Sequence, residues 1–498
     1  MQKLITIFQR IVFFFIGLFL QFSALAQSLP PMPLPLPTAD SASIFAAPVG
    51  LLQIGDETFI STRLQPEFVL GRVGVGLDVP IVYSLTNNKI REEEYRDGIG
   101  VLRMIRYVRY GRKGRDKLAF RLGGLYGVSV GHGTLINNYS NAPSFERRKV
   151  GVQFDIHPIE YVGVEGLYSD LNGINIVGIR PYIRPLAFLE DVPVLKNFEI
   201  GATYAADFDQ YTINARGDRV KNNFVKDGVV TQSVDLGLFL VKRDNAEVSF
   251  FAQYGMMNKN TALESTIQKA LAQDPDTAAQ NLLKRKGLDL DNANTVSRLA
   301  QYGNGTALSA GIRAKFQLIA NTAWLEARLE RYEATANYVP QFFDAFYEID
   351  KDRKLAQVAA TQGTGGTYGS LTGLILNKIR LSGVLQLPDL VSAANPAFVR
   401  VDLDGTDVII PNVIAQAQYF KGGFTTFSEA FTLDQRSLLT SRLAYRIFSW
   451  AIVGVDYRWT FALVEENGVN RFKAQQYVSP YFAINIPLGG GGNVNFNE

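Results

Sequence analysis

The feature that most constrains the fold of this chain is an alternation of apolar and polar residues with a period of two, repeated along most of the sequence. In Arg72–Ser84, one strand face would carry Val73, Val75, Leu77, Val79, Ile81 and Tyr83, and the other mainly small, polar or charged residues. The pattern recurs in Lys117–Val128, Arg148–His157, Thr306–Leu318 and Arg471–Leu488. Because successive side chains of a strand point to opposite faces, each segment predicts a β-strand with one apolar face.

A soluble β-sandwich also alternates, so further features must decide between the two classes. The segments run to about 10–15 residues, which is longer than a usual soluble strand and suits a tilted membrane-crossing strand. Aromatic residues such as Tyr107, Tyr110, Tyr457 and Trp459 gather near the segment ends, as in the interfacial girdles of membrane barrels. We therefore predict an all-β fold, a transmembrane antiparallel up-and-down β-barrel.

The connectors between these segments alternate in length, which predicts an orientation. Membrane barrels keep short turns on the periplasmic side and long loops outside. Within the predicted barrel domain, residues 47–488, we count about 16 strands (14–18) between Thr58 and Leu488, with Ala47–Ile54 as an extra strand if the turn at Gly71 is periplasmic. The long connectors are Leu85–Gly98, Gly131–Glu146, Gln210–Gly228 and Asn258–Asn304, and the short ones include Gly111–Asp116, Pro158–Glu160, Arg243–Asn245 and Ile319–Asn321.

The N-terminus has the pattern of a secretory signal peptide. Lys3 and Arg10 precede a short apolar core, and Ala24-Leu25-Ala26 predicts cleavage before Gln27. Residues 27–46 are Pro-rich and are expected to form an extended periplasmic leader, and residues 489–498 a polar tail. We therefore expect the mature protein in the outer membrane of a Gram-negative-type bacterium.

Composition excludes several classes of site. The chain has no cysteine, which removes disulfides, zinc–thiolate sites and cysteine nucleophiles. The net charge is +3 and there is no polybasic run, so nucleic acid is not an expected partner. We expect no metal and no cofactor.

One stretch breaks the alternation. Residues 260–302 carry Ala, Leu, Gln and Lys at helical spacing, interrupted by Asp274-Pro275-Asp276 and Gly287. We predict two or three short helices inserted in one outer loop. A solvated cap with no specific role and a ligand-binding or plug role both remain open.

The alternation also predicts which charged side chains face the lumen. Charges facing lipid near the middle of a bilayer cost roughly 2–4 kcal/mol each for Arg and Lys, so these residues need water. The lining could sort solutes by the sign of their charge, or it could be a lattice of ion pairs that fills a narrow barrel. The candidates are Arg103, Arg109, Arg121, Asp155, Glu165, Arg313, Lys315, Glu326, Arg328, Arg442, Arg446, Asp456 and Arg458.

Two patterns resist this interpretation. Arg103, Arg106 and Arg109 are spaced by three, so Arg106 must face lipid, snorkel, or lie at a β-bulge. His132 and His157 are the only histidines, and no nucleophile motif accompanies them. A barrel hydrolase acting on envelope lipid would need a positioned triad, so we predict no catalytic residue and no enzyme.

The cleavage site, the repeated alternation and the closing segment Gln476–Leu488 together resemble porin-like outer-membrane β-barrel proteins. In that group the last strand is read by the barrel-assembly machinery, which the resemblance implies as a partner alongside outer-membrane lipid. This chain departs from the group because residues 489–498 follow the closing segment, so the assembly signal would be internal.

The sequence predicts a channel for small polar solutes with a charged lumen. The alternative is a non-conducting anchor whose long outer loops bind a partner. The sequence does not identify the solute or the oligomeric state.

Overall fold

The computed structural model describes residues 43–487, apart from 55–56, 91–97, 114–115, 142–148, 174, 190, 209–210, 214–218, 222–227, 244, 273–277, 286–287, 320–321, 346, 349–350, 377, 407–410, 435, 449–450 and 467–468. The predicted signal peptide, most of the predicted leader and the polar tail lie outside the described residues.

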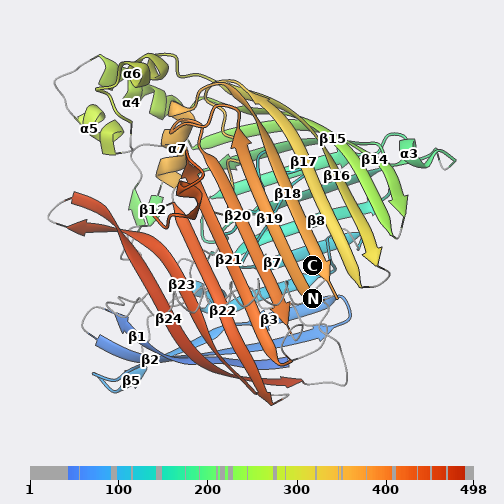
Figure 1. Ribbon diagram of the computed structural model, residues 1–498, viewed down its shortest axis with the longest axis vertical. Helices are drawn as coiled ribbons and strands as arrows, with labels where there is room; N and C mark the ends of the chain where they lie inside the picture. Colours follow the sequence, from blue (N-terminus) through green and yellow to red (C-terminus); the bar gives the residue numbers. More distant parts are fainter. Residues whose placement is uncertain are drawn as a thin grey trace.

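One large antiparallel sheet forms the body of the molecule (Figure 1). Each strand pairs with the next along the chain, and a short ladder of Ser43–Ala46 with Ile484–Pro487 brings the last strand back to the first. The wall strands are β1 (Ser43–Ile54), β2 (Glu57–Leu70), β3 (Val73–Leu77), β4 (Val79–Ser84), β6 (Ile105–Tyr110), β7 (Leu118–Gly123), β8 (Gly151–Ile159), β9 (Val162–Tyr168), β10 (Ile176–Ile183), β11 (Glu199–Asp207), β14 (Val229–Arg243), β15 (Ala246–Met257), β16 (Gly305–Ile319), β17 (Ala323–Ala334), β18 (Thr364–Ile375), β19 (Ile379–Pro388), β20 (Ala397–Thr406), β21 (Val413–Phe424), β22 (Ser437–Phe448), β23 (Ala451–Glu466) and β24 (Val469–Pro487).

This arrangement confirms the predicted all-β, antiparallel up-and-down barrel, with more strands than expected. The sheet has 22 strands, of which β3 and β4 form one pass and β5 (Lys89–Ile90) is a two-residue strand that pairs antiparallel with the end of β4, so the described wall has 20 passes. The estimate of about 16 fell short at β1 and in the region after residue 363. In β18, glycine and threonine interrupt the apolar alternation and hide the strand.

The connections fall at two ends, as predicted. One end, here called the short-turn end, holds turns such as residues 71–72 and 160–161, and Gly71 adopts a φ of 59° in the first of them. The other, here called the long-connection end, holds residues 85–104, 124–150, 208–228, 258–304 and 335–363. β1 starts at the short-turn end, which confirms the extra N-terminal strand.

Burial along the wall is reversed relative to a soluble protein. On β14, Val234 and Leu236 are 52% and 41% exposed, whereas Ser233 and Asp235 between them are 7% and 2% exposed. Phe250, Leu308, Ile312, Leu329 and Leu371 continue the exposed apolar face around neighbouring strands. An apolar outer face with a polar inner face is the arrangement that a lipid bilayer requires of a barrel.

The remaining elements lie outside the wall. They are α2 (Gly98–Arg103), α3 (Pro193–Lys196), the pair β12 (Tyr211–Ile213) and β13 (Arg219–Lys221), α4 (Thr261–Leu271), α5 (Ala278–Arg285), α6 (Ala293–Ala300), α7 (Lys351–Ala360) and the 3-10 helix η1 (Glu429–Phe431). Figure 1 shows α4, α5, α6 and α7 gathered at one end of the barrel. No helix among the described residues is long and apolar enough to cross a membrane.

Two predicted strands are shorter in the structure. The expected strand over residues 99–110 begins as helix α2, and only Ile105–Tyr110 joins the wall. The expected strand Lys117–Val128 ends at Gly123. Gly123 has a φ of 128°, which L side chains rarely adopt, and the chain then turns away from the wall.

Candidate functional site

The lumen at the long-connection end is occupied by the chain itself. Residues 124–141, here called the inward loop, leave β7 and lie against the inner faces of several strands. A Cβ placed at Gly237 on β14 would come within 3.1 Å of His132 Nε2, and one at Gly255 on β15 within 3.2 Å of Thr134. Glycines in the wall therefore make room for this loop.

A second segment, residues 335–348, lies beside the inward loop and is here called the crossing segment. Ile136 and Phe343 form a parallel bridge, and the Phe343 N–H donates to the Leu135 carbonyl at 3.0 Å. Asn337 and Gln341 have φ values of 63° and 52°, unusual for residues other than glycine. Backbone strain of this kind persists only where the surroundings hold it in place.

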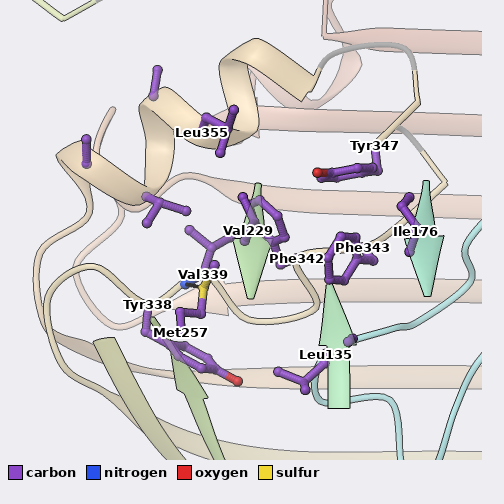
Figure 2. Close-up of a cluster of buried hydrophobic side chains, with 14 of the residues drawn as sticks. Leu135, Ile176, Val229, Met257, Tyr338, Val339, Phe342, Phe343, Tyr347 and Leu355 are labelled. Carbon is purple, nitrogen blue, oxygen red and sulfur yellow. Dashed lines mark hydrogen bonds between the residues drawn. The ribbon is translucent and has the colours of Figure 1, made fainter. Parts of the chain in front are cut away.

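The crossing segment carries the centre of an apolar core. Phe342 and Phe343 are fully buried, and their rings pack edge to face at 5.1 Å. Figure 2 shows them with Leu135 of the inward loop, Leu355 of α7 and Met257 of the wall. Inner-wall members of the same cluster are Leu167, Ile176, Ala205, Val229, Met257 and Ala307.

The helical insert belongs to this core as well. The structure has three helices in residues 261–300, which agrees with the predicted two or three. Leu263 and Ile267 of α4, Leu283 of α5 and Leu299 of α6 are fully buried. Asn260 and Asn292 cap α4 and α6 by accepting backbone N–H bonds. The insert therefore packs onto the segments in the lumen.

Two buried ion pairs fasten the crossing segment and α7 to the wall. Asp207 at the end of β11 accepts from Tyr347 Oη and from Lys351 Nζ, both at 2.7 Å. Glu348 accepts from Tyr139 Oη at 2.5 Å and from Lys149 Nζ at 2.8 Å. Burial and the neighbouring carboxylates raise the pKa of both tyrosines, which therefore stay protonated and donate these bonds.

A buried arginine links acidic side chains of the inner wall between β9 and β14. Arg180 is 2% exposed and bonds Glu165 at 3.0 Å, Glu199 at 2.8 Å and Asp235 at 2.9 Å. The short turn before β7 contributes Lys113, which also pairs with Glu165. Asp155 lies directly opposite Glu165 and accepts from Tyr182 Oη at 3.4 Å. Asp155 and Glu165 thus face the lumen as predicted.

Sequence reasoning missed Arg180, although the signal was present. In β10, Val177, Ile179 and Ile183 point outward, which places Gly178, Arg180 and Tyr182 on the inner face. The same alternation that identified Glu165 would have identified Arg180.

His132 of the inward loop lies next to this cluster. Its ring stacks on Phe251 at 4.8 Å, and its Nε2 is 3.7 Å from Asp235 Oδ1. Burial, together with the Arg180 cation, lowers the pKa of His132 to about 3, so the imidazole is neutral at pH 7. Among the described residues, the side chains around His132 do not form a catalytic triad with it.

The inner face becomes accessible toward the short-turn end of β16 and β17. Arg328 is buried between the Phe251 and Tyr368 rings and bonds Glu330 at 2.5 Å. Arg313 and Glu326, closer to the short turn, are 40% and 46% exposed and 3.9 Å apart. Lys315 is exposed and lies 5.2 Å from the Trp324 ring. All four predicted lining residues here lie on the inner face.

The inner wall of β20–β23 is polar over part of its length, and Phe398, Phe420 and Leu438 form an apolar cluster on the same face. Arg442 and Asp456 form a double hydrogen bond, each at 2.8 Å. Arg446 lies on the same face of β22, half-buried. Arg458 lies opposite Thr440 in the ladder, and its side chain is outside the described residues.

The arginines of β6 and β7 are placed differently from the prediction. Arg103 ends helix α2 and does not belong to a wall strand, so its assignment as a strand residue lining the lumen is wrong. Arg106 is the extra residue of a β-bulge, since Gly76 pairs with Tyr107 and Leu77 with Ile105. The bulge turns Arg106 inward, where it pairs with Glu67. Arg109 and Arg121 face the lumen as predicted, directly opposite each other.

The comparisons with known proteins do not by themselves assign the fold, so the assignment rests on the structure. No protein-family model matches the chain, and no curated protein matches it. Among solved structures, OccK11 (OpdR) of Pseudomonas aeruginosa is 11% identical, covering 90% of this chain and 95% of that one, with a TM-score of 0.30. OpdQ of the same organism is 11% identical, with coverages of 90% and 98% and a TM-score of 0.31.

Wzi of Escherichia coli, described as an outer membrane protein involved in group 1 capsule assembly and a carbohydrate-binding β-barrel, is 11% identical. The match covers 91% of this chain and 85% of Wzi, with a TM-score of 0.33. The strand pairing, the apolar outer face and the polar inner face described above make the chain a porin-like β-barrel of the outer-membrane type.

Proposed function

We propose that this protein is an outer-membrane channel for small polar solutes, with a water-filled vestibule at the short-turn end and a chain-filled region at the long-connection end. By the lengths of the connections, the short-turn end is the periplasmic one. The proposal combines a membrane barrel with an inner wall that carries solvated charges.

The observation that carries this proposal is the exposure of inner-facing charges near the short turns. Arg313 and Glu326 are 40% and 46% exposed although they lie on the inner face. An ion pair whose partners are nearly 4 Å apart and this exposed is solvated by water rather than sealed in a packed core. Water thus reaches well into the barrel from this end.

The inner wall of β20–β21 supports the same conclusion. Arg400 bonds Asp402, and Gln418 and Gln416 bond Asp402 and Asp404 at 2.8 and 3.1 Å. These side chains are half-buried or buried, and amide and carboxylate groups line the face instead of an apolar core. A polar wall of this kind offers hydrogen bonds to a hydrated solute.

Single-channel conductance of the refolded protein in a planar lipid bilayer, under a salt gradient, tests the proposal. We expect steady current steps and an ion preference that shifts toward cations in a Lys315→Glu variant. Arg331→Gln is the matched control, because Arg331 lies on the outer face with Glu333 and Asp389. A barrel that is folded by its heat-dependent gel mobility but stays silent would overturn the proposal.

A second function is favoured by the apolar core in the lumen. Because the inward loop, the crossing segment and the helical insert pack together, the long-connection end presents a structured surface. The protein could then be a non-conducting anchor whose outer surface binds a partner. Silence of the folded wild-type barrel, with conductance appearing when the crossing segment is released, would support this second function.

A further inference from the structure

The inner wall of β6 and β7 carries a cluster of cationic side chains that the channel proposal leaves unexplained. Arg109 on β6 and Arg121 on β7 are directly opposite in the ladder, and Arg106 lies next to them at the bulge. Like charges placed directly opposite on neighbouring strands destabilise the pair. Arg109 and Arg121 therefore place two positive charges at facing positions of the inner wall.

An acidic side chain at this cluster, that of Glu67, pairs with Arg106. Glu67 of β2 accepts hydrogen bonds from Arg106 Nη2 and from Tyr107 Oη. The guanidinium of Arg121 lies 4.8 Å from the Tyr107 ring and its Nε donates weakly to the Gly124 carbonyl at 3.4 Å. Glu67 thus compensates the charge of Arg106.

Arg109 is buried with unsatisfied donors. It is 5% exposed, and its Nε and Nη2 atoms make no hydrogen bond to any described residue. A buried donor without a partner destabilises the fold, and a charged one does so more strongly. A guanidinium has five N–H donors arranged to meet the paired oxygens of a carboxylate or phosphate.

The neighbouring strand is shaped to hold these side chains flat against the wall. A Cβ at Gly74 would lie 2.8 Å from Arg109 Nε, and one at Gly76 would lie 3.0 Å from the Arg106 guanidinium. Glycine at both positions of β3 therefore leaves space for the arginines along the wall. Arg106 is also held by Glu67, whereas no described acidic side chain is bonded to Nε or Nη2 of Arg109.

We propose that Arg109 and Arg121 form a binding site for a small oxyanion, a carboxylate or phosphate group carried by a solute. An oxyanion at Arg109 would satisfy its free donors and screen its repulsion from Arg121. The inference deepens the proposed function, on which its relevance to transport rests, because the site faces the same lumen. The binding itself does not require conductance.

Thermal unfolding of the refolded protein in detergent tests the site independently of transport. Acetate, inorganic phosphate and chloride are titrated separately at constant ionic strength. We expect the unfolding temperature to rise by about 2 °C or more with acetate or phosphate, saturably, because a ligand that binds only the folded state stabilises it. Arg109→Gln should lose this response, whereas the outer-face control Arg331→Gln should keep it.

The outcomes separate the two proposals. A response to phosphate alone would assign the site to phosphate-bearing solutes, and a response to both anions would assign it to oxyanions in general. An equal response to chloride, or none, would overturn the site even in a conducting barrel. Saturable stabilisation in a silent barrel would keep the site and reject the channel. If Arg109→Gln does not fold, Arg121→Gln carries the same test.

Discussion

Along β16, the inner face changes character within a few residues. Ala307, Ser309 and Gly311 near the long connection are buried, whereas Arg313 and Lys315 on the same face are half-buried and exposed. β17 repeats the change, with Arg328 and Glu330 buried and Glu326 exposed. On β16 the buried residues are small and the exposed ones are long and charged, whereas on β17 charged residues stand in both halves. The two halves of the lumen therefore differ in how much of the inner face is exposed.

The comparison of the two halves yields four predictions, beginning with the packed half. Phe343→Asp places an unpaired carboxylate in the apolar core, which costs several kcal/mol (roughly 2–7 for an unpaired polar group and more for a charge). We expect the crossing segment to detach while the wall stays folded, with a severalfold gain in single-channel conductance.

Phe427→Asp is the matched control, because Phe427 is 80% exposed and lies outside this core. It should leave conductance unchanged. Faster cleavage by trypsin would show that the crossing segment has detached in the folded Phe343→Asp barrel. If conductance is then unaltered, the segment does not obstruct the lumen.

The next effect concerns the buried ion pairs. Asp207→Asn removes the carboxylate that pairs with Lys351 and accepts from Tyr347. Breaking a buried pair by removing one partner costs about 3–5 kcal/mol, because the other charge is left uncompensated. We expect faster tryptic cleavage after Lys354, with the wall intact.

A Lys351→Met change added to Asp207→Asn removes the stranded charge and should restore part of the protection. Cleavage at the wild-type rate in Asp207→Asn would contradict the role given to this pair.

The third prediction is a dependence of stability on pH. Burial lowers the pKa of His132 to about 3, below its ordinary value of 6.5, so the unfolded chain binds the proton more readily. The stability that neutral His132 contributes is complete above about pH 6.5 and is lost progressively as the pH falls toward 3.

Thermal unfolding at pH 7 and pH 4.5 measures this effect. We expect His132→Asn to lose less stability than the wild type between these two values. Equal losses of stability in the two proteins would show that protonation of His132 does not destabilise the folded state. His157→Asn is the control, since His157 lies on β8 outside the inward loop.

The smallest effect belongs to the open half. Arg313→Gln removes a half-exposed partner of Glu326, and exposed pairs contribute about 0–1 kcal/mol. We expect an unfolding temperature close to that of the wild type and a shift of the reversal potential toward cation preference. A large loss of stability without a change in selectivity would indicate that this half is packed as well.

The alternation in the sequence predicted the class of the wall, because each wall strand must present an apolar face to lipid, but it did not predict the full number of strands. It placed Asp155, Glu165, Arg328 and Arg442 on the inner face, where the structure has them. It could not predict which half of the lumen is filled, since that depends on contacts between segments far apart, such as Ile136 with Phe343. Arg103 and Arg106 were ambiguous because a helix and a bulge interrupt the period locally.

The attachment of the crossing segment also bears on how it could move. Its first residue follows β17 directly, and its other end leads through α7 to β18, and Ala334 and Thr364 are paired in the ladder. A displaced segment would therefore remain tethered by both ends, at an effective concentration of the order of millimolar for a short flexible link. Opening and return would be unimolecular, so dilution of the protein would not slow the return, and the wall would keep its register throughout.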